Sequence, residues 1–363
     1  MKRFLKKFNS RTILIAVFVC FPLVLLGAIV ISEDRSISVN ENRVLTTGAD
    51  ITFDVMDGKL QDSLEKYLSD QFPLRDTLKG AEVNLKLTFG STDIGGAYVG
   101  QDGRLFQKLL DSDVDKDKCV RYAARVNRIA EETGIPTVVM YVPSSGIALP
   151  GAMPNGAPMY DYDGLYKALQ KELKSVQMID LRKALANEPE YYYTTDHHWT
   201  AAGVAQAYHE WRVAHGTVSD SDAPQLMTVS DRFRGTLWSR VPSERIGYEK
   251  MQAPKLETEL IVTADGKEIG LYDYDALKTK DKYNFFQGGN HGILTVENPA
   301  VSNGKVLMIL KDSFANSFLP CIVNDYQKII MIDERYAFID AGQFAKDGGV
   351  TEIAVIREII SVG

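Results

Sequence analysis

The sequence predicts an α/β domain with a mostly parallel β-sheet, preceded by a separate apolar helix at the N-terminus. Three observations lead to this fold class. From residue 137 onward, short runs rich in Val, Ile, Leu and Met recur, amphipathic stretches separate several of them, and polar residues, Gly or Pro often end them. Buried strands that alternate with helices are typical of a parallel sheet covered by helices on both faces.

The first predicted elements are helical. Apolar periodicity runs from residue 60 to residue 87 and is interrupted at Pro73. Residues 98–106 place two short apolar runs around Asp102-Gly103, which predicts a β-hairpin. An amphipathic helix is expected over residues 115–133, where Gly134 ends it.

The strand and helix alternation follows. Strands are predicted at residues 137–142, 178–181, 305–310, 328–332 and 352–357. Helices are predicted at residues 164–174, 201–214 and 314–326, the last with Pro320 inside it. Thr200 is a suitable N-cap for the second of these helices. Residues 217–296 are rich in Gly, Pro and aromatic residues and are expected to be loops and short strands.

The N-terminus predicts a cytoplasmic basic tail and a membrane anchor over residues 1–32. Five basic residues precede 19 uncharged ones, which is close to the ~20 residues that cross a bilayer. The basic flank predicts a cytoplasmic N-terminus with the rest of the chain outside. Since no A-x-A-like cleavage site follows, an uncleaved anchor is favoured over a signal peptide, which would leave the protein secreted. Residues 33–58 are expected to be a stalk, and residues 59–363 one extracytoplasmic domain with a loop- and β-rich insertion at about 217–300.

Charge and cysteine content exclude several classes of function. Apart from the basic tail, acidic residues exceed basic ones by about twelve, the opposite of the balance in nucleic-acid-binding domains. Cys119 and Cys321 are the only cysteines outside the apolar segment and are expected to be buried free thiols. No Cys and His spacing of a zinc site is present, and no cofactor is expected.

The stretch Asp196-His197-His198-Trp199 holds two of the five histidines of the chain, and Ser313 follows a predicted strand far downstream. An acid, an imidazole and a hydroxyl are the parts of a serine acyl-transfer site. If the turn is tight, Asp196 orients His198, and the free imidazole nitrogen faces Ser313. His197 would then make a structural hydrogen bond.

Each of these residues also has another interpretation. Ser313 or Asp312 can simply cap the helix that follows, and the two histidines can belong to a solvated loop. A metal site made of Asp196, His198 and His209 is less favoured, because no histidine pair has i,i+4 spacing.

Three further side chains are candidates for contacts with an oxyanion or a substrate. Asn290 follows two glycines in Gly288-Gly289-Asn290-His291, and Asn316 lies three residues after Ser313. An asparagine amide can donate to an oxyanion, although a simple turn also explains the first motif. Trp238 is a candidate for lining a sugar-binding face, and a buried tryptophan is the alternative.

These motifs resemble those of the bacterial DHHW proteins. The likeness includes Glu41-Asn42-Arg43-Val44-Leu45, the run Asp70-Gln71-Phe72-Pro73-Leu74-Arg75-Asp76, the hairpin, the Gly288 motif and Lys311-Asp312-Ser313-Phe314-Ala315-Asn316-Ser317. DHHW proteins are in turn similar to the SGNH hydrolase-like alginate O-acetyltransferase proteins. That resemblance implies a flavodoxin-like three-layer fold with a circularly rearranged motif order.

The resemblance also implies a function. Asp196, His198 and Ser313 match the acid, base and nucleophile of enzymes that transfer acetyl groups onto an extracellular polysaccharide, often beside a membrane-bound O-acyltransferase partner. An acetyl esterase with the same triad is the alternative enzyme. A polysaccharide-binding or cell-envelope assembly protein without catalysis is the alternative of another class.

Overall fold

The computed structural model describes residues 10–362, with the exception of residues 39, 42, 56 and 219–222. Four residues of the predicted basic tail, Lys2, Arg3, Lys6 and Lys7, lie outside the described residues, as does Asn42 of the first DHHW-like motif. By compactness the chain divides into two units, residues 1–89 and residues 90–363, and each is described by itself.

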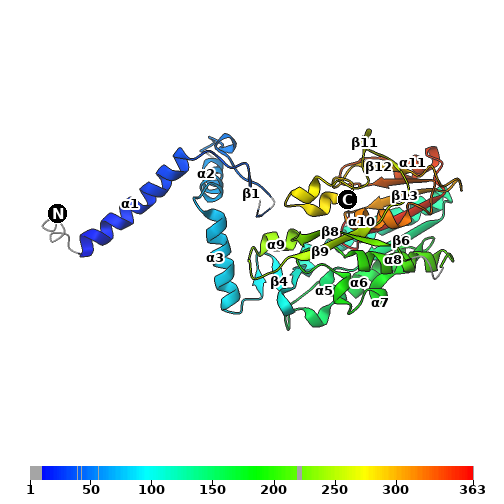
Figure 1. The fold of residues 1–363 in the computed structure, drawn as a ribbon, viewed down its shortest axis with the longest axis horizontal. Coiled ribbons are helices and arrows are strands. Elements are labelled where there is room, and N and C mark those ends of the chain that lie inside the picture. The colour runs from blue at the N-terminus through cyan, green and yellow to red at the C-terminus, as the bar shows by residue number, and fades with distance from the viewer. Residues whose placement is uncertain (1–9, 39, 42, 56, 219–222, 363) are drawn as a thin grey trace. The chain divides into compact units, whose positions relative to one another are not determined.

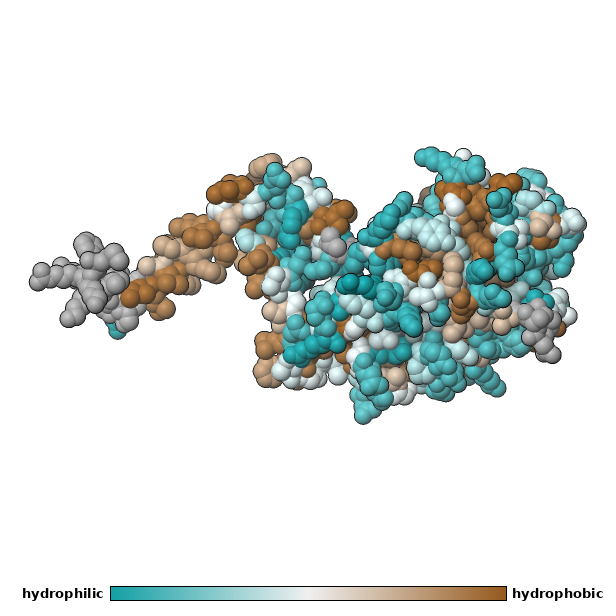
Figure 2. All heavy atoms as spheres, in the orientation of Figure 1, coloured by the Kyte–Doolittle hydropathy of each residue, from teal (hydrophilic) through white to brown (hydrophobic). Residues whose placement is uncertain are grey.

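The first unit begins with helix α1 (Ser10–Ile31), whose residues Ile13–Ile31 are long and apolar enough to cross a membrane. The face of α1 seen in Figure 2 carries mostly apolar side chains. A core helix or a signal sequence passes the same test of length and composition, so the anchor stays a prediction.

The predicted stalk contains ordered structure. Strands β1 (Ile37–Ser38) and β2 (Arg43–Val44) pair antiparallel, and helices α2 (Lys59–Asp70) and α3 (Arg75–Thr88) follow. Asp70 accepts hydrogen bonds from Arg43 and from the backbone of Thr46, and Arg75 pairs with Glu41 at 2.9 Å. These contacts tie Glu41, Arg43 and Thr46 to the two helices. The unit extends to Phe89 and includes helices that the sequence assigned to the large domain.

The second unit contains an eight-stranded mixed sheet in the order β11-β10-β12-β14-β13-β15-β6-β7 (Figure 1). Five strands are parallel: β6 (Thr137–Val142), β7 (Gln177–Asp180), β13 (Val306–Lys311), β14 (Lys328–Ile332) and β15 (Glu352–Glu358). Three antiparallel strands complete one edge: β10 (Ile261–Ala264), β11 (Lys267–Ile269) and β12 (Ile293–Glu297). The predicted parallel strands are therefore confirmed to within one residue at most ends.

Helices cover both faces of the sheet, as the alternation of apolar runs predicts. Helices α4 (Lys116–Thr133), α6 (Tyr162–Glu172) and α11 (Ala341–Asp347) bury apolar side chains on one face. Helices α7 (Leu181–Ala184), α8 (Ala201–Ala214) and α10 (Phe314–Ile322) do so on the other. Successive strand residues alternate between the two cores, for example Met308 and Ile309. Cys119 and Cys321 are buried free thiols in these separate cores.

The segment predicted as an insertion at about 217–300 has two parts. Strands β8 (Leu226–Phe233) and β9 (Glu249–Pro254) form a separate antiparallel pair, with the short helix α9 (Thr236–Arg240) between them. Strands β10 to β12 instead extend the main sheet, so only part of the segment stands apart from it.

The remaining elements are helix α5 (Ser145–Ala148) and a small sheet of β3 (Asp93–Ile94), β4 (Ala97–Val99) and β5 (Leu105–Gln107). The last two strands form the predicted hairpin, with Asp102 at φ 53°.

Candidate active site

Ser313 lies at the carboxyl end of the central strand β13, where open parallel sheets commonly place their sites. The strand ends at Lys311, and Ser313 immediately precedes helix α10 with an ordinary helical conformation. Asp312 accepts hydrogen bonds from the backbone N–H groups of Phe314 and Glu358, both at 2.9 Å, and so shapes this turn. The Ser313 side chain makes no capping hydrogen bond. Its hydroxyl is thus available for another partner.

The loop that carries the two histidines is fastened to α10. Tyr192 and Trp199 form an isolated antiparallel bridge at its ends. The indole N–H of Trp199 donates to the Phe314 carbonyl at 3.1 Å and to Ser317 Oγ at 2.8 Å. Trp199 is fully buried, so the fourth residue of the Asp-His-His-Trp motif anchors the other three beside the serine.

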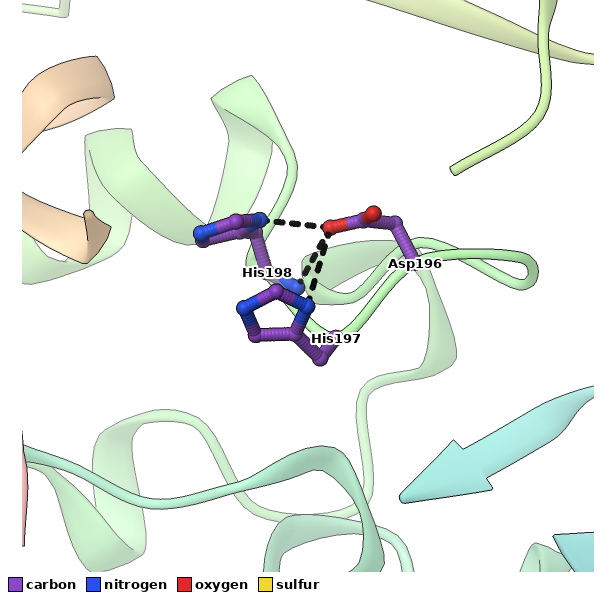
Figure 3. Close-up of side chains that lie close together, drawn as sticks. All are labelled: Asp196, His197 and His198. Atoms are coloured by element: carbon purple, nitrogen blue, oxygen red, sulfur yellow. Dashed lines mark hydrogen bonds and ion pairs between the residues drawn. The ribbon is translucent and has the colours of Figure 1, made fainter. Parts of the chain in front are cut away.

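Asp196, His198 and Ser313 form a continuous line of hydrogen bonds. Asp196 Oδ1 lies 2.5 Å from His198 Nδ1 and also accepts the His198 backbone N–H at 3.0 Å (Figure 3). His198 Nε2 lies 2.8 Å from Ser313 Oγ. Because an ionised carboxylate only accepts, the imidazole proton sits on Nδ1 and Nε2 accepts from the hydroxyl. This is the contact distance expected of a nucleophile and its base.

The second oxygen of Asp196 is held by α9. Asp196 Oδ2 accepts the backbone N–H of Thr236 at 2.7 Å and its hydroxyl at 3.0 Å. Gly235 packs so closely on Asp196 that a side chain there would overlap it. Burial opposes ionisation, yet the two neighbouring histidines and the Thr236 N–H hold the pKa of Asp196 well below its usual range. Asp196 is therefore a buried, fixed carboxylate.

Glu249 supports the same loop from strand β9. Its carboxylate accepts the backbone N–H groups of Thr194 and Thr195 at 2.7 and 2.8 Å, as well as the Thr195 hydroxyl. Burial raises the pKa of Glu249 although these hydrogen bonds oppose the shift. The sequence analysis missed Glu249 and Thr236, because neither lies near the motif in the chain.

The two histidines differ in their surroundings. The His198 ring stacks on Tyr283 with centroids 3.8 Å apart and planes 8° apart, which fixes its orientation. His197 Nδ1 lies 2.8 Å from Thr236 Oγ1. Burial, reinforced by His198, lowers the pKa of His197 to about 3, so His197 is neutral near pH 7. It occupies the supporting place that the sequence analysis expected.

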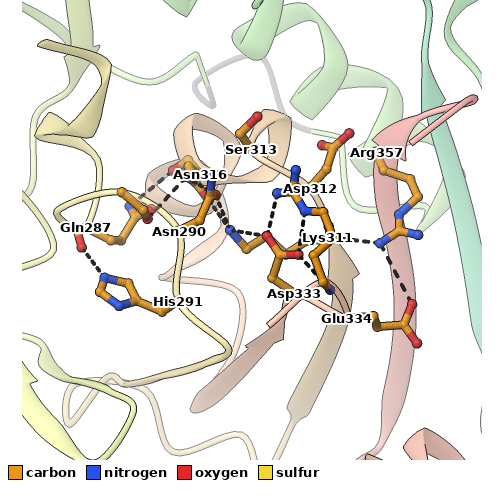
Figure 4. A network of polar contacts seen from close by, with 12 residues as sticks. Gln287, Asn290, His291, Lys311, Asp312, Ser313, Asn316, Asp333, Glu334 and Arg357 are labelled. Carbon is orange, nitrogen blue, oxygen red and sulfur yellow. Dashed lines mark hydrogen bonds and ion pairs between the residues drawn. The ribbon is translucent and has the colours of Figure 1, made fainter. Parts of the chain in front are cut away.

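On the other side of the serine, three polar residues form a compact network. The buried ammonium of Lys311 donates to Asn290 Oδ1 at 2.9 Å and to Asn316 Oδ1 at 2.7 Å. Figure 4 shows this network beside Asp333, with the Ser313 hydroxyl pointing away from it. Burial lowers the pKa of Lys311 to about 8, against the attraction of Asp333 and Asp312. We call Lys311, Asn290 and Asn316 the amide side of Ser313, and Asp196, His198 and Thr236 its imidazole side.

For Trp238, the sequence left two alternatives open, a sugar-binding face and a buried tryptophan, and the structure matches the second. It is buried, and its indole N–H donates to the Ser243 carbonyl at 3.0 Å. Arg234 and Lys280 lie 4.7 and 4.3 Å from the ring centroid. The ring is thus covered by protein and presents little surface to a sugar.

Asp196, His197 and His198 also form a group whose ligand atoms lie within 4.8 Å of one another. His209, which the sequence analysis combined with Asp196 and His198, is exposed on α8 and is not in this group. Both oxygens of Asp196 and the Nδ1 of each histidine already take part in the hydrogen bonds described above. The hydrogen bonding of the group therefore fits acid–base chemistry better than metal ligation.

The domain that carries this site is similar in fold to known proteins. Residues 98–255 match the family model of the SGNH hydrolase-like domain of acetyltransferase AlgX. A DHHW family protein from Eubacterium siraeum DSM 15702 superposes with a TM-score of 0.62 and 24% identity, over 74% of this chain and 92% of that one. The second unit therefore has an SGNH hydrolase-like fold.

A second solved structure has the same fold. PatB1 of Bacillus cereus, determined with a sulfonyl adduct, superposes with a TM-score of 0.60 and 19% identity, over 72% of this chain and 93% of that one. No curated protein sequence matches the chain. The family-model match includes Asp196 and His198 of the SGNH-like domain but ends before Ser313, so the role of the serine depends on its own geometry.

Proposed function

We propose that the protein is a serine-dependent O-acetyltransferase that acts on a polysaccharide. The observation that carries the proposal is the hydrogen-bonded line from Asp196 through His198 to Ser313, with 2.8 Å between His198 Nε2 and Ser313 Oγ. Acyl transfer needs a nucleophile, a base within hydrogen-bond reach and an acid that orients the base. These three side chains meet that requirement.

In the first step, Ser313 Oγ attacks the carbonyl carbon of an acetyl ester or thioester while His198 Nε2 takes the hydroxyl proton. Asp196 stabilises the imidazolium and keeps its ring oriented. The tetrahedral intermediate then collapses, and the leaving alcohol or thiol takes the proton from His198. The product is an acetyl ester on Ser313.

In the second step, His198 removes a proton from an acceptor hydroxyl, and the acceptor oxygen attacks the acetyl-serine ester. As the ester bond to Ser313 breaks, His198 returns the proton to Ser313 Oγ. A sugar hydroxyl as acceptor makes the reaction a transfer, and water makes it an esterase reaction. The likeness to an acetyltransferase domain supports the first outcome. The sulfonyl adduct of PatB1 supports a nucleophile in this fold, because sulfonyl reagents modify activated serine hydroxyls.

We further propose that α1 anchors the protein in a membrane, with the SGNH-like domain outside the cytoplasm. Length and apolar composition of Ile13–Ile31 support this location. A membrane-bound O-acyltransferase partner would supply the acetyl group at the same membrane.

The decisive experiment measures release of a chromophore from an acetyl ester by the full chain in detergent. Ser313→Ala should reduce the rate to the uncatalysed background, whereas the matched control Ser302→Ala, at an exposed serine, should keep the wild-type rate. Equal rates for wild type and Ser313→Ala would sink the catalytic proposal and favour a binding or assembly protein.

Two further measurements sharpen the result. A sulfonyl fluoride should form one covalent adduct on the wild type, with loss of fluoride, and none on Ser313→Ala, as read by intact-mass spectrometry. With oligosaccharides added, acetylated sugar identifies a transferase, whereas acetate alone identifies an esterase.

A further inference from the structure

His197 has a ring nitrogen that the two-step reaction above does not use. Its Nδ1 lies 2.8 Å from Thr236 Oγ1, whereas none of the hydrogen bonds among the residues that the structure describes involves its Nε2. The side chain of His197 is 27% exposed, compared with 5% for that of His198. Of the two imidazoles, His197 is thus the one more open to a molecule that approaches from solvent.

The two imidazoles pack against each other beside Ser313. Their centroids are 3.8 Å apart, with planes tilted by 37°. Tyr283 stacks on His198 at the same separation and nearly parallel, so it covers one face of that ring and His197 lies against the other. The ring centroid of Phe314, which follows the serine, is 5.9 Å from that of His197 and 5.0 Å from that of His198. Both imidazoles therefore border the start of the helix that carries the serine.

Both rings turn the same edge toward Asp196. Asp196 Oδ1 lies 2.5 Å from Nδ1 of His198 and 3.6 Å from Nδ1 of His197. In Figure 3 the other nitrogen of each ring, Nε2, accordingly lies on the side away from the carboxylate. His198 Nε2 contacts Ser313 Oγ at 2.8 Å. Because the packed rings have the same orientation, His197 Nε2 opens toward the same space beside the Ser313 hydroxyl.

The hydrogen bonds of Thr236 determine where the His197 proton sits. A hydroxyl has one proton to donate, and the ionised Asp196 only accepts. Thr236 Oγ1 lies 3.0 Å from Asp196 Oδ2, so the hydroxyl donates there and accepts from the Nδ1–H of His197. Donation to His197 instead would leave two acceptor oxygens facing each other at 3.0 Å. Since burial lowers the pKa of His197 to about 3, the ring is neutral near pH 7 and its Nε2 carries a free lone pair.

A lone pair at this place suits the neighbour of a reacting hydroxyl. In the second step, the proton of the attacking hydroxyl goes to His198, so that hydroxyl has no proton left for His197. On a sugar ring, however, most hydroxyls have a second hydroxyl on the next carbon. While one hydroxyl donates to His198 Nε2, its neighbour can donate to His197 Nε2, because both acceptors face the same space. A lone alcohol makes only the first of these hydrogen bonds.

We propose that His197 is a specificity-determining residue that selects acceptors with two neighbouring hydroxyl groups, that is, vicinal diols. The inference rests on the proposed function of Ser313 and names the acceptor class of that site. His197 Nε2 accepts the hydrogen bond of the hydroxyl next to the reacting one. The covalent step is unchanged: the acceptor oxygen bonds to the acetyl carbon, the bond from that carbon to Ser313 Oγ breaks, and His198 carries the proton to Ser313 Oγ.

The test offers small alcohols to the acetylated enzyme. The full chain in detergent turns over the chromogenic acetyl ester with vicinal trans-cyclohexanediol, its monomethyl ether or cyclohexanol present, and the ratio of acetylated alcohol to acetate is measured by chromatography. One neutral hydrogen bond changes such a ratio by about threefold to tenfold. Per hydroxyl, the diol should exceed cyclohexanol by this factor, whereas the ether, whose second oxygen cannot donate, should not. Equal ratios for the diol and its ether would overturn the inference.

Two substitutions separate the roles of the two ring nitrogens. The amide of His197→Asn reaches about as far as Nδ1, so it keeps a donor for Thr236 but offers nothing at Nε2. His197→Gln places an amide oxygen near the position of Nε2. The first variant should acetylate the diol and its ether equally per hydroxyl, and the second should keep part of the preference for the diol. An unchanged preference in His197→Asn would contradict the proposal.

Three controls keep the test conclusive. His209→Asn, at an exposed histidine, should keep the wild-type ratios. The comparison of diol and ether on the wild type needs no variant, so it decides the question even where thermal unfolding shows that His197→Asn does not fold. Ser313→Ala separates the two proposals: if it releases chromophore as fast as the wild type, the proposed function fails. If release requires Ser313 but the wild type acetylates the diol no better than the ether, or not at all, only the role of His197 fails.

Discussion

The imidazole side of Ser313 depends on a loop held from outside the main sheet, whereas the amide side is built largely on β13 and α10. On the imidazole side, a buried carboxylate, Asp196, lies behind the ring and is held by α9. On the amide side, a buried ammonium, Lys311, lies behind two asparagines. Acyl transfer develops positive charge on the imidazole and negative charge on the carbonyl oxygen. The two sides thus hold buried charges of opposite sign, and only the carboxylate is hydrogen-bonded to the ring that contacts Ser313.

Removal of the base should have the largest effect. His198→Ala leaves Ser313 without a proton acceptor, and we expect kcat/KM for the acetyl ester to fall by about 10⁴-fold or more. His209→Ala, at an exposed histidine on α8, is the matched control and should keep wild-type activity. A loss of less than tenfold for His198→Ala would mean that the imidazole side does not act as base.

A smaller effect is expected when only the support of the acid is weakened. Thr236→Val removes the hydroxyl that bonds Asp196 Oδ2 and His197 Nδ1, but keeps the backbone N–H. Asp196 keeps its charge and its other hydrogen bonds, so we expect a loss of only about 1 kcal/mol, which lowers kcat by roughly fivefold to tenfold. Thr263→Val, on strand β10, serves as the control. A collapse to the level of His198→Ala would show that the hydroxyl takes part in the chemistry.

The smallest effect on activity is expected when Glu358 is substituted. Its buried side chain makes no hydrogen bond to the described residues, and it belongs to neither the imidazole side nor the amide side of Ser313. Burial, and secondly Asp312, raises the pKa of Glu358 to about 8. The folded protein therefore keeps this proton between about pH 4.5 and pH 8 while the unfolded chain releases it, so this residue makes stability fall as pH rises through that window.

Glu358→Gln should remove this dependence. We expect its thermal midpoint to exceed that of the wild type by an amount that grows between pH 5 and pH 8, with kcat nearly unchanged. A constant difference across this pH range would show that the carboxyl group ionises normally in the folded protein.

The sequence was a good guide where one local pattern determines the structure. The apolar runs predicted the parallel strands, and the Asp-Gly pair predicted the hairpin at Asp102. Ser313 could be proposed because it follows a strand, and Asp196 and His198 because they lie only two positions apart. The catalytic roles of these residues stay predictions until activity is measured.

The rest could not be predicted, because it depends on contacts between distant segments. Glu249 lies more than 50 residues from the loop it supports, and Tyr283 stacks on His198 from another part of the chain. Neither residue is part of a recognisable motif. The sequence analysis also did not predict that the antiparallel strands β10 to β12 join the main sheet, because short strands among Gly and aromatic residues resemble an insertion.

The contact between His198 and Ser313 joins positions 115 residues apart. A chain that is synthesised from its N-terminus therefore contains the imidazole long before the serine. The serine reaches the imidazole only when β13 has entered the sheet between β14 and β15, both of which come later in the sequence. The hydrogen-bonded line from Asp196 to Ser313 therefore requires nearly the whole domain to be in place, and under the proposed function the acylating site forms late in synthesis.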